Sequence, residues 1–402
     1  MKNRKDLKDH SRKNQHKKAK RICIVRNKPY PVSPNRRNAE TLVANGYDVD
    51  IICMKKKGEK SQETVGEIKL YRLPLEPRRG SGLRYIFEFF TFFIMASWKL
   101  TWLNLKRRYQ VIEVSGIPDF MVFIAIVPKL MGSSVILNFL DHTADYFEEK
   151  YSVSSKHIVV RLLRFFEKTS GRWADHVFCT QIVTKELLVS RGVPESKISV
   201  VLNVPDETIF DRRVTIHNHK DNGKFRLITH GSLLEIYGIQ TLIKAVPLLI
   251  IEIPNLEVKV VGDGEYRPYL EQLAQSLKIS KYIDFTGMVT QEEVREHIIQ
   301  SDIGVVAVHC KFPALSNKIF EYLAMGLPAV VTSISANKAY FDESSVKFFE
   351  PDNELELAHC ILKLYQNPDK RIALAAAGSA TYQKYRWEIM KEGYLKVFEK
   401  LS

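Results

Sequence analysis

The side chains best suited to chemistry in this 402-residue chain lie between Ser316 and Glu321. Lys318 and Glu321 are three positions apart, so a helix that begins near Ser316 places both on one face. The first turn of such a helix offers unpaired backbone N–H groups and the positive end of the helix dipole, which favour a phosphate. Lys318 would add a positive charge there, and the Glu321 carboxylate could accept both hydroxyls of a ribose. The alternative is a Lys and Glu pair on the surface of an amphipathic helix.

Glycines follow two strand-like runs in the same half of the chain. Gly231 ends one run, and Gly262 and Gly264 follow the other with Asp263 between them. Because glycine has no side chain, the backbone can approach a ligand closely at such positions. Glycines that serve only the geometry of a turn would explain either motif equally well.

In the first half of the chain, polar residues follow two further strand-like runs. Asn138 to His142 ends one run and includes Asp141, and Ser115 to Asp119 ends another. Strand ends of this kind meet at one edge of a parallel sheet. A lone histidine is more often structural, so His142 and its neighbour Asp141 remain candidates on the sequence alone.

The elements that would position these residues are short Val- and Ile-rich runs alternating with longer amphipathic stretches. This alternation predicts an α/β protein with parallel strands and crossover helices. In the first half the predicted strands are 21–25, 48–53, 111–114, 134–138, 176–179 and 198–202. In the second half they are 225–228, 256–261, 283–285, 303–306 and 328–331.

The chain is longer than a single core usually grows, so we predict two doubly wound domains. A polar segment interrupts the alternation between them. The predicted divisions are a basic tail, a first domain, a linker, a second domain and a C-terminal helix, at residues 1–20, 21–206, 207–224, 225–380 and 381–402. Two such domains facing each other would place their strand ends on the two walls of a central cleft.

Charge and cysteine usage limit the function classes. The net charge is +14, and residues 1–21 contribute +8 of it, from ten Lys or Arg against Asp6 and Asp9. Such an arm would be attracted to anionic lipid or nucleic acid, or would only aid solubility. No apolar run follows it, so we expect a cytoplasmic protein. The five cysteines are scattered, which is typical of reduced, buried thiols and predicts neither a disulfide nor a zinc site.

The segment from Tyr85 to Leu105 is aromatic and apolar, but Glu88 and Lys99 interrupt it. The stretch between them is too short to cross a bilayer about 30 Å thick. We therefore expect either a buried core helix or contact with a membrane surface. The basic residues from Lys106 to Arg108 favour the second reading.

The stretch from Pro313 to Val331 resembles the signature helix of family 4 glycosyltransferases, which have the GT-B fold of two facing Rossmann-like domains. Its loop, Lys318, Phe320-Glu321 and Gly326-Leu327-Pro328 match that pattern. The resemblance covers about residues 20 to 380 and includes these further segments: 173–179, 184–192, 200–203 with Phe210, 230–233 with Gly238, 260–264 and 285–288.

This resemblance implies roles for individual residues. It implies a catalytic region with His142 at the transferred sugar, Asp141 beside it and Lys318 at the phosphates. A neutral imidazole can donate a hydrogen bond to the donor. The residues implied to bind the donor are Gly231, Ser232, Gly262, Gly264, Met288, Ser316, Asn317, Lys318 and Glu321. Gly231 and Ser232 would lie near the pyrophosphate, and the backbone at Met288 would pair with the base.

Three departures from the family pattern bear on the donor. Pro313 stands where the family often has Glu, and the usual Arg and Lys are replaced by Ser232 and Tyr237. The first loop, from Asn27 to Arg37, holds prolines in place of paired glycines. The phosphate charge would therefore rest more heavily on Lys318 and the helix dipole.

The resemblance implies a retaining transfer that needs no metal or other cofactor, in which the nucleotide sugar is a substrate. We expect a UDP-sugar first and GDP-mannose second. The expected acceptor is lipid-linked or a polysaccharide in envelope glycan synthesis, reached from the cytoplasmic side at an anionic membrane surface. One alternative is a non-catalytic nucleotide-sugar-binding protein. A nucleic-acid-binding protein is a third reading, but the body lacks a recognisable nucleic-acid module.

Overall fold

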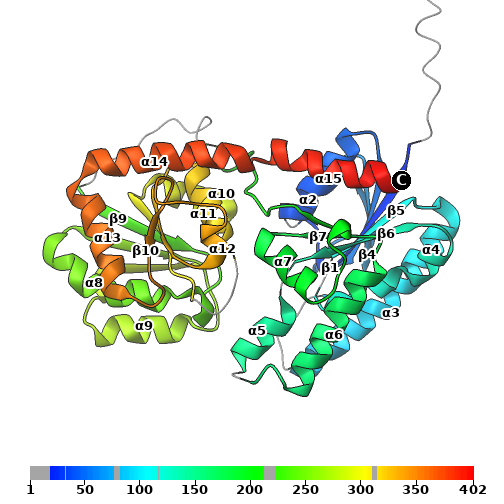
Figure 1. The fold of residues 1–402 in the computed structure, drawn as a ribbon, viewed down its shortest axis with the longest axis horizontal. Coiled ribbons are helices and arrows are strands. Elements are labelled where there is room, and N and C mark those ends of the chain that lie inside the picture. The colour runs from blue at the N-terminus through cyan, green and yellow to red at the C-terminus, as the bar shows by residue number, and fades with distance from the viewer. Residues whose placement is uncertain are drawn as a thin grey trace, which may run out of the picture.

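In a computed structural model, the protein consists of two sheets of mostly parallel strands, each flanked by helices (Figure 1). The structure describes residues 19–31, 33–76, 82–115, 117–140, 142–151, 153–211, 223–309 and 315–402. Residues 1–18 of the predicted tail and 212–222 of the predicted linker lie outside the described residues, as do Asp141, Cys310 and Pro313.

The N-terminal sheet has eight strands in the order β3-β4-β2-β1-β5-β6-β7-β8. All neighbours are parallel except β3 and β4. The strands are β1 (Arg21–Pro29), β2 (Asp48–Met54), β3 (Gln62–Val65), β4 (Ile68–Leu73), β5 (Val111–Ser115), β6 (Ser134–Phe139), β7 (His176–Cys179) and β8 (Ile198–Val200). The main helices around it are α2 (Ser33–Ala44), α3 (Gly82–Arg107), α4 (Ile126–Leu130), α5 (Thr143–Lys150), α6 (Ile158–Trp173) and α7 (Ile182–Ser190), with the 3₁₀ helix η1 (Asp119–Ala125).

The C-terminal sheet has six strands in the order β11-β10-β9-β12-β13-β14. They are β9 (Phe225–His230), β10 (Leu256–Val261), β11 (Ile283–Gly287), β12 (Ile303–Val306), β13 (Ala329–Thr332) and β14 (Lys347–Phe349). The helices are α8 (Ile239–Glu252), α9 (Arg267–Ser276), α10 (Gln291–Ile299), α11 (Asn317–Ala324), α12 (Ser335–Lys338), α13 (Glu354–Gln366), α14 (Pro368–Tyr382) and α15 (Trp387–Leu401). The sheet reverses direction of growth between β9 and β12, which is where doubly wound sheets bind ligands.

The central strands are buried on both faces, and this explains their sequences. β9 and β13 are buried at every position, as parallel strands covered by helices on both sides must be. Cys23, Cys53, Cys179 and Cys360 are buried free thiols that pack among these apolar side chains.

Helices α14 and α15 form a strap that joins the two domains. Figure 1 shows α14 running along the C-terminal domain and α15 continuing over the N-terminal domain. The Trp387 indole N–H donates to Thr41 of α2 at 2.9 Å, and the Tyr394 hydroxyl donates to the buried Glu113 of β5 at 2.8 Å. Phe398 is fully buried beside Phe178 of β7. The last helix of the chain therefore completes the core of the first domain.

The GT-B architecture with a C-terminal helix crossing back is confirmed, with two differences in detail. The single late helix expected from about Thr381 is instead two helices, which a short 3₁₀ turn and the extended Arg386 separate. Glu207 fixes that break, because its carboxylate accepts hydrogen bonds from the Arg386 guanidinium and the Trp387 amide. Strands β3, β4 and β14 were not predicted from the sequence.

Candidate active site

The C-terminal domain gathers the ends of β9, β10 and β11 at the start of α11. Gly231 and Gly262 follow β9 and β10 and have φ angles of +109° and +135°. Residues with a Cβ atom rarely adopt such angles. A Cβ on Gly262 would lie 2.0 Å from the Gly231 carbonyl oxygen, and one on Gly264 would lie 2.3 Å from the Leu233 carbonyl oxygen. These glycines are therefore required for two backbone turns to touch.

Lys318 lies over the first of these turns. Its Cε atom would be 3.1 Å from a Cβ on Gly231, and its Nζ lies 4.8 Å from the centre of the Tyr237 ring. Burial lowers the pKa of Lys318 to about 8, and the nearby Glu321 carboxylate opposes that shift. The ammonium group is thus poorly solvated, and an anion placed beside it would gain a strong interaction.

Glu321 faces the end of β9. One carboxylate oxygen lies 3.0 Å from Nε2 of His230, the last residue of that strand. Both of these atoms are buried, and within the described residues neither makes a hydrogen bond of good geometry. A buried carboxylate oxygen in this state is costly in a folded protein, so a ligand hydroxyl would find an acceptor here. No role was predicted for His230, although its position at a strand end directly before Gly231 was a signal for one.

The other residues assigned to the donor surround this cluster. Ser232 and Asn317 are exposed, and Ser316 is the N-cap of α11 without a side-chain capping hydrogen bond to the described residues. Met288 is 73% exposed and follows Gly287, which bridges to Gly262. The Gly231 amide already donates to the Val261 carbonyl at 2.8 Å, so a ligand would meet other atoms of that turn.

His142 lies on the wall formed by the N-terminal domain, just before α5. It is 3% exposed, and its Nε2 lies 2.7 Å from the Thr184 hydroxyl. Burial lowers its pKa to about 4; Asp145 opposes this and Arg191 reinforces it. The imidazole is therefore neutral at physiological pH. Asp141, its predicted companion, lies outside the described residues.

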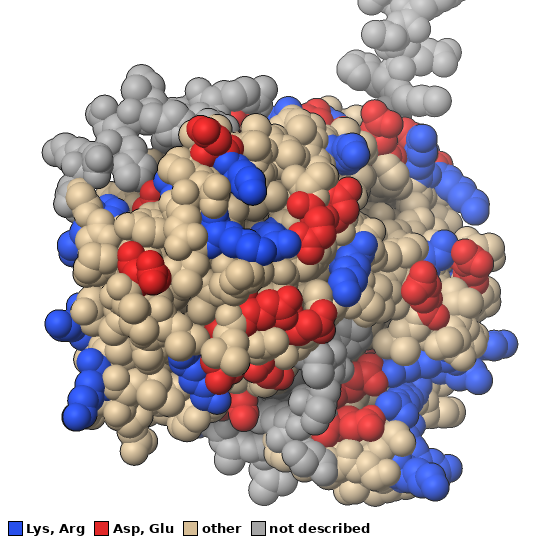
Figure 2. All heavy atoms as spheres, turned by 60° about the vertical axis from the view of Figure 1, so that its left-hand side comes forward, with Lys and Arg blue, Asp and Glu red and all other residues tan. Residues whose placement is uncertain are grey.

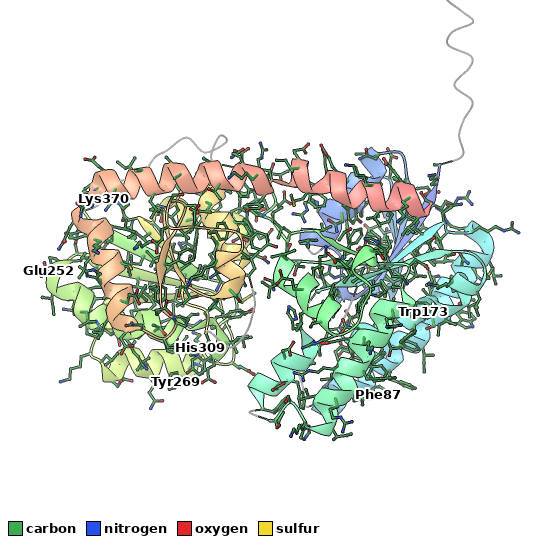
Figure 3. All side chains as sticks on the ribbon, viewed as in Figure 1. Phe87, Trp173, Glu252, Tyr269, His309 and Lys370 are labelled. Atoms are coloured by element: carbon green, nitrogen blue, oxygen red, sulfur yellow. The ribbon has the colours of Figure 1, made fainter. Side chains whose placement is uncertain are left out.

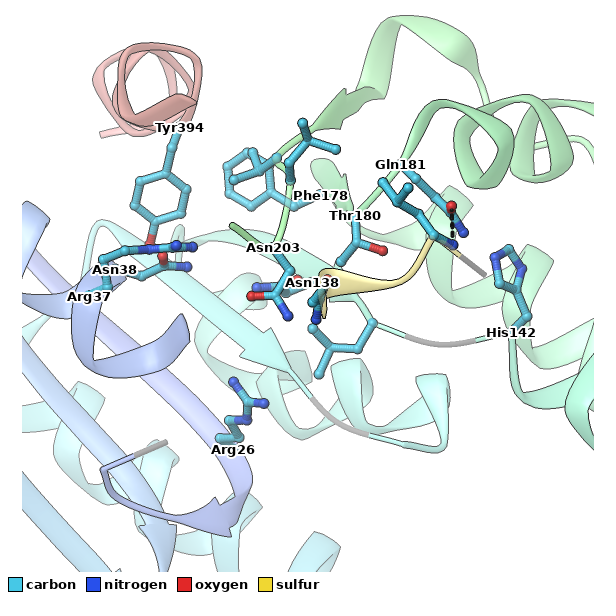
Figure 4. Close-up of a pocket in the computed structure, with 15 residues that line it drawn as sticks. Arg26, Arg37, Asn38, Asn138, His142, Phe178, Thr180, Gln181, Asn203 and Tyr394 are labelled. Carbon is cyan, nitrogen blue, oxygen red and sulfur yellow. Dashed lines mark hydrogen bonds between the residues drawn. The ribbon is translucent and has the colours of Figure 1, made fainter. Parts of the chain in front are cut away.

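A cavity beside His142 separates the two walls (Figure 4). Its lining comes mainly from the N-terminal domain, and Leu315 and Asn317 are its contribution from the C-terminal domain among the described residues. The Gln181 side chain crosses the boundary and accepts a hydrogen bond from the Leu315 amide at 2.9 Å. The structure thus groups the predicted donor residues on one wall and places His142 on the other. Within the described ranges, no three His, Cys, Asp or Glu side chains cluster as a metal site would require.

Comparison with known families accounts for both domains. A model described as "Glycosyl transferase 4-like domain" matches residues 35–203, and one described as "Glycosyl transferases group 1" matches residues 224–367. The chain belongs to the group 1 glycosyltransferase family. The family matches cover both walls of the cleft and include His142, the donor cluster and α11.

Curated relatives of the family are distant. A GDP-mannose-dependent monoacylated alpha-(1-6)-phosphatidylinositol monomannoside mannosyltransferase of Corynebacterium glutamicum is 24% identical over 40% of this chain and 44% of its own length. The alpha-monoglucosyldiacylglycerol synthase of Acholeplasma laidlawii is 28% identical over 45% of this chain and 44% of its own. The chain thus spans about half the length of several of the curated relatives it matches.

Two solved structures share the fold of this chain. The sucrose-phosphate synthase of Thermosynechococcus elongatus superposes with a TM-score of 0.77 at 17% identity, over 95% of this chain and 99% of that one. Anabaena HepE in complex with UDP-glucose gives a TM-score of 0.71 at 13% identity, over 94% and 99%.

Proposed function

We propose that this protein transfers a sugar from a nucleotide diphosphate donor to an acceptor bound against the N-terminal domain. The observation that carries the proposal is the cluster in which Lys318, Gly231 and Glu321 meet at the ends of β9 and α11. A diphosphate beside Lys318 and the N-terminus of α11 would place a ribose within reach of Glu321. This orientation supports the roles assigned to Ser232, Gly262, Gly264, Met288, Ser316 and Asn317.

The proposed transfer retains the anomeric configuration and uses no metal. The leaving diphosphate would gain charge as the glycosidic bond breaks, and Lys318 with the α11 dipole would stabilise that charge. The same phosphate would help take the proton of the acceptor hydroxyl on the same face. His142, as a neutral imidazole, would contribute through hydrogen bonding and shape the sugar site, with Asp141 as its proposed neighbour.

We favour a UDP-sugar as donor, with GDP-mannose second. Relatives of both kinds exist, since Anabaena HepE was solved with UDP-glucose and the Corynebacterium relative is named for GDP-mannose. A thermal-shift and calorimetric panel of UDP, GDP, ADP and their sugars tests the assignment. We expect the nucleoside diphosphate of one base to raise the melting temperature of the protein more than the others do. If no nucleotide diphosphate bound at millimolar concentration, the proposed function would be wrong.

A non-catalytic nucleotide-sugar-binding protein is the second candidate, and one contact favours it. The Tyr237 ring lies against Lys318 at the position where the family usually has a basic residue. Donor hydrolysis or transfer to an added acceptor distinguishes the two. Binding without any turnover, across a panel of lipid and glycan acceptors, would favour the second candidate.

We further propose that the protein works at the cytoplasmic face of an anionic membrane on a lipid-linked or glycan acceptor of the envelope. The N-terminal domain exposes an apolar surface along α3, α4 and α6, here called the apolar face. Its members are Phe87, Phe90, Ile94, Trp98, Leu105, Ile126, Val127, Leu130, Met131, Ile158, Leu162 and Phe165. Scattered exposed apolar residues are normal, but a contiguous helical stripe of them indicates a binding surface.

Packing holds these helices side by side. Phe120 of η1 lies 6.1 Å from Phe93 of α3 and 5.4 Å from Phe166 of α6, between ring centroids. Figure 3 shows Phe87 at the edge of the domain opposite the strap. Arg84, Lys106, Arg161 and Lys168 are further side chains of α3 and α6, and an apolar face with basic neighbours fits anionic lipid.

No helix in the described ranges is both long and apolar enough to span a bilayer. Figure 2 shows the molecule with its C-terminal domain turned forward. On this face, Lys and Arg are interspersed with Asp and Glu. Such a mixed surface does not favour a nucleic acid, which needs a basic field.

Membrane docking is tested with vesicles: binding to anionic lipid should fall with salt and fall further when residues 1–20 are removed. Equal binding to neutral vesicles would argue against it.

A further inference from the structure

The cavity beside His142 has a chemistry that the donor site does not use. It measures about 230 Å³, and two of its lining residues are arginines, Arg26 and Arg37. Figure 4 shows Arg26 reaching toward the cavity from the end of β1, while Arg37 and Asn38 border it from α2. Among its described lining residues there is no carboxylate. The cavity therefore carries positive charge on the acceptor side of the cleft.

Arg37 is held rigidly at this wall. Its guanidinium stacks on the Trp387 ring at 3.9 Å, and one nitrogen donates to the Val204 carbonyl at 2.5 Å. Its Nε is buried and makes no hydrogen bond to the described part of the chain. Burial lowers the pKa of Arg37 to about 10, which still leaves it charged at physiological pH. A fixed, poorly solvated guanidinium of this kind is suited to an anionic ligand.

Arg26 is only 8% exposed, and the buried carboxylate of Glu113 acts on it electrostatically. Glu113 lies on the neighbouring strand, where it accepts hydrogen bonds from Asn138 at 2.8 Å and Tyr394 at 2.8 Å. Burial raises the pKa of Glu113, and Arg26 is among the groups that oppose the shift. Glu113 is not among the residues that line the cavity.

Neutral polar groups lie beside apolar side chains in the rest of the lining. Thr180 and Asn203 project from the segments after β7 and β8, and Asn38 lies beside Arg37 (Figure 4). Hydroxyl and amide groups can donate hydrogen bonds to the remaining oxygens of an anion. Two guanidinium groups surrounded by such donors match a phosphate or a carboxylate, which guanidinium groups bind in bidentate geometry.

We infer that this cavity binds an anionic group, a phosphate or a carboxylate, carried by the sugar acceptor. The inference rests on the proposed function, because it assigns the acceptor to the wall that faces the donor cluster. It adds that the acceptor is charged close to the hydroxyl that receives the sugar, so neutral glycans and neutral glycolipids would bind poorly. Lys318 and Gly231 do not line the cavity, whereas His142 and Asn317 do, so the cavity adjoins the donor site without including the proposed phosphate contacts.

The test uses inorganic phosphate as the probe, with the full chain held saturated by the nucleoside diphosphate that it binds best. Occupying the donor site in this way leaves the cavity as the second phosphate site. We expect saturable phosphate binding by calorimetry in the wild type, and at least tenfold weaker binding in Arg26→Gln and Arg37→Gln. Arg26→Lys retains the charge and should lose less.

Arg36→Gln is the matched control, since Arg36 is exposed on the same helix as Arg37 and pairs with Glu40 at 2.8 Å. It should bind phosphate as the wild type does. If wild-type protein saturated with nucleoside diphosphate binds no phosphate, the inference is overturned, whatever the variants do. If Arg26→Gln weakens nucleoside diphosphate binding tenfold, the cavity belongs to the donor and the inference is also overturned. Absence of nucleotide binding in the wild type would instead contradict the proposed function.

Discussion

The ammonium group of Lys318 lies between the Tyr237 ring and the Gly231 turn, where the side chain is partly buried. Desolvation of this kind costs free energy that a surface lysine does not lose, and the lowered pKa is its signature. Proteins retain such poorly solvated groups where a ligand restores the lost interaction. Substitutions of single residues in this cluster therefore test the donor site most directly.

Replacing Lys318 with Ala should lower kcat about tenfold or more, because the leaving diphosphate gains charge in the transition state. Affinity for the free nucleoside should barely change, since a nucleoside has no phosphates. Steady-state transfer or donor hydrolysis, beside calorimetry with nucleoside and nucleoside diphosphate, measures both. Normal turnover and normal diphosphate affinity in the variant would remove Lys318 from the site.

The pH dependence of diphosphate binding provides an independent check. The pKa of Lys318 is lowered to about 8, so its charge is present below pH 8 and is lost as the pH rises through that value. Affinity for the nucleoside diphosphate should therefore decline between pH 7 and pH 9, by at most about tenfold per pH unit. Lys318→Arg should bind with little pH dependence across that range. A wild-type profile as flat as that of the Arg variant would contradict the prediction.

Glu321→Ala should weaken donor binding by about 1 to 3 kcal/mol, because the ribose hydroxyls lose a charged acceptor. The nucleoside should lose affinity as much as the diphosphate does, which distinguishes this residue from Lys318. Glu271→Ala on α9 is a matched control, since Glu271 is an exposed carboxylate paired with Arg267. Nucleoside affinity that matches the wild type in a folded Glu321 variant would show that the ribose binds elsewhere.

Among the elements, most buried strands were predictable from the sequence, whereas β3, β4 and β14 were not. The predicted ranges for β7, β10 and β12 agree with the structure; β7 and β12 are buried at every position, and β10 alternates buried and partly exposed positions along its first four residues. β3 is exposed at every position, and its Gln62–Val65 sequence has no apolar alternation that could identify it. β14 has three residues, which is too few for a period to appear.

The candidate site was also predictable only in part. Gly231, Gly262 and Lys318 could be nominated because turn glycines and a helix N-terminus leave a local sequence pattern. Contacts between distant segments leave none, so the approach of His230 to Glu321 was missed. The arginine-lined cavity was missed for the same reason, because Arg26, Arg37 and Asn203 come together only when separate segments of the first domain meet.

The proposed membrane contact can be tested by substitutions on helix α3. Phe90→Ser combined with Trp98→Ser should lower binding to anionic vesicles severalfold, because both side chains are exposed on the apolar face. The melting temperature should hold, since neither residue belongs to the core. Ile251→Ser, at an exposed position on α8 of the other domain, is the control. Vesicle binding that survives the double change would assign membrane contact to another surface.

The whole molecule depends on the strap formed by α14 and α15. Phe398→Ala removes a fully buried ring from the joint core of α15 and the N-terminal sheet, and should cost about 3 to 5 kcal/mol of unfolding free energy. Ile389→Ala, on the same helix but 48% exposed, should stay within about 0.5 kcal/mol of the wild type. Denaturant unfolding of the two variants measures the difference, and equal stabilities would show that α15 is not part of that core.

The position of α15 also has a consequence for how the protein is made. A ribosome releases the N-terminal sheet long before it releases Trp387, Tyr394 and Phe398, which cover one face of that sheet. Until then, apolar side chains of β1 and β7 lack their final partner, and exposed apolar surface of this kind recruits chaperones or aggregates. The Glu113 carboxylate also lacks the hydrogen bond from the Tyr394 hydroxyl until α15 has been synthesised. Nascent chains stalled before residue 387 should therefore be more sensitive to protease in their first domain than the released protein.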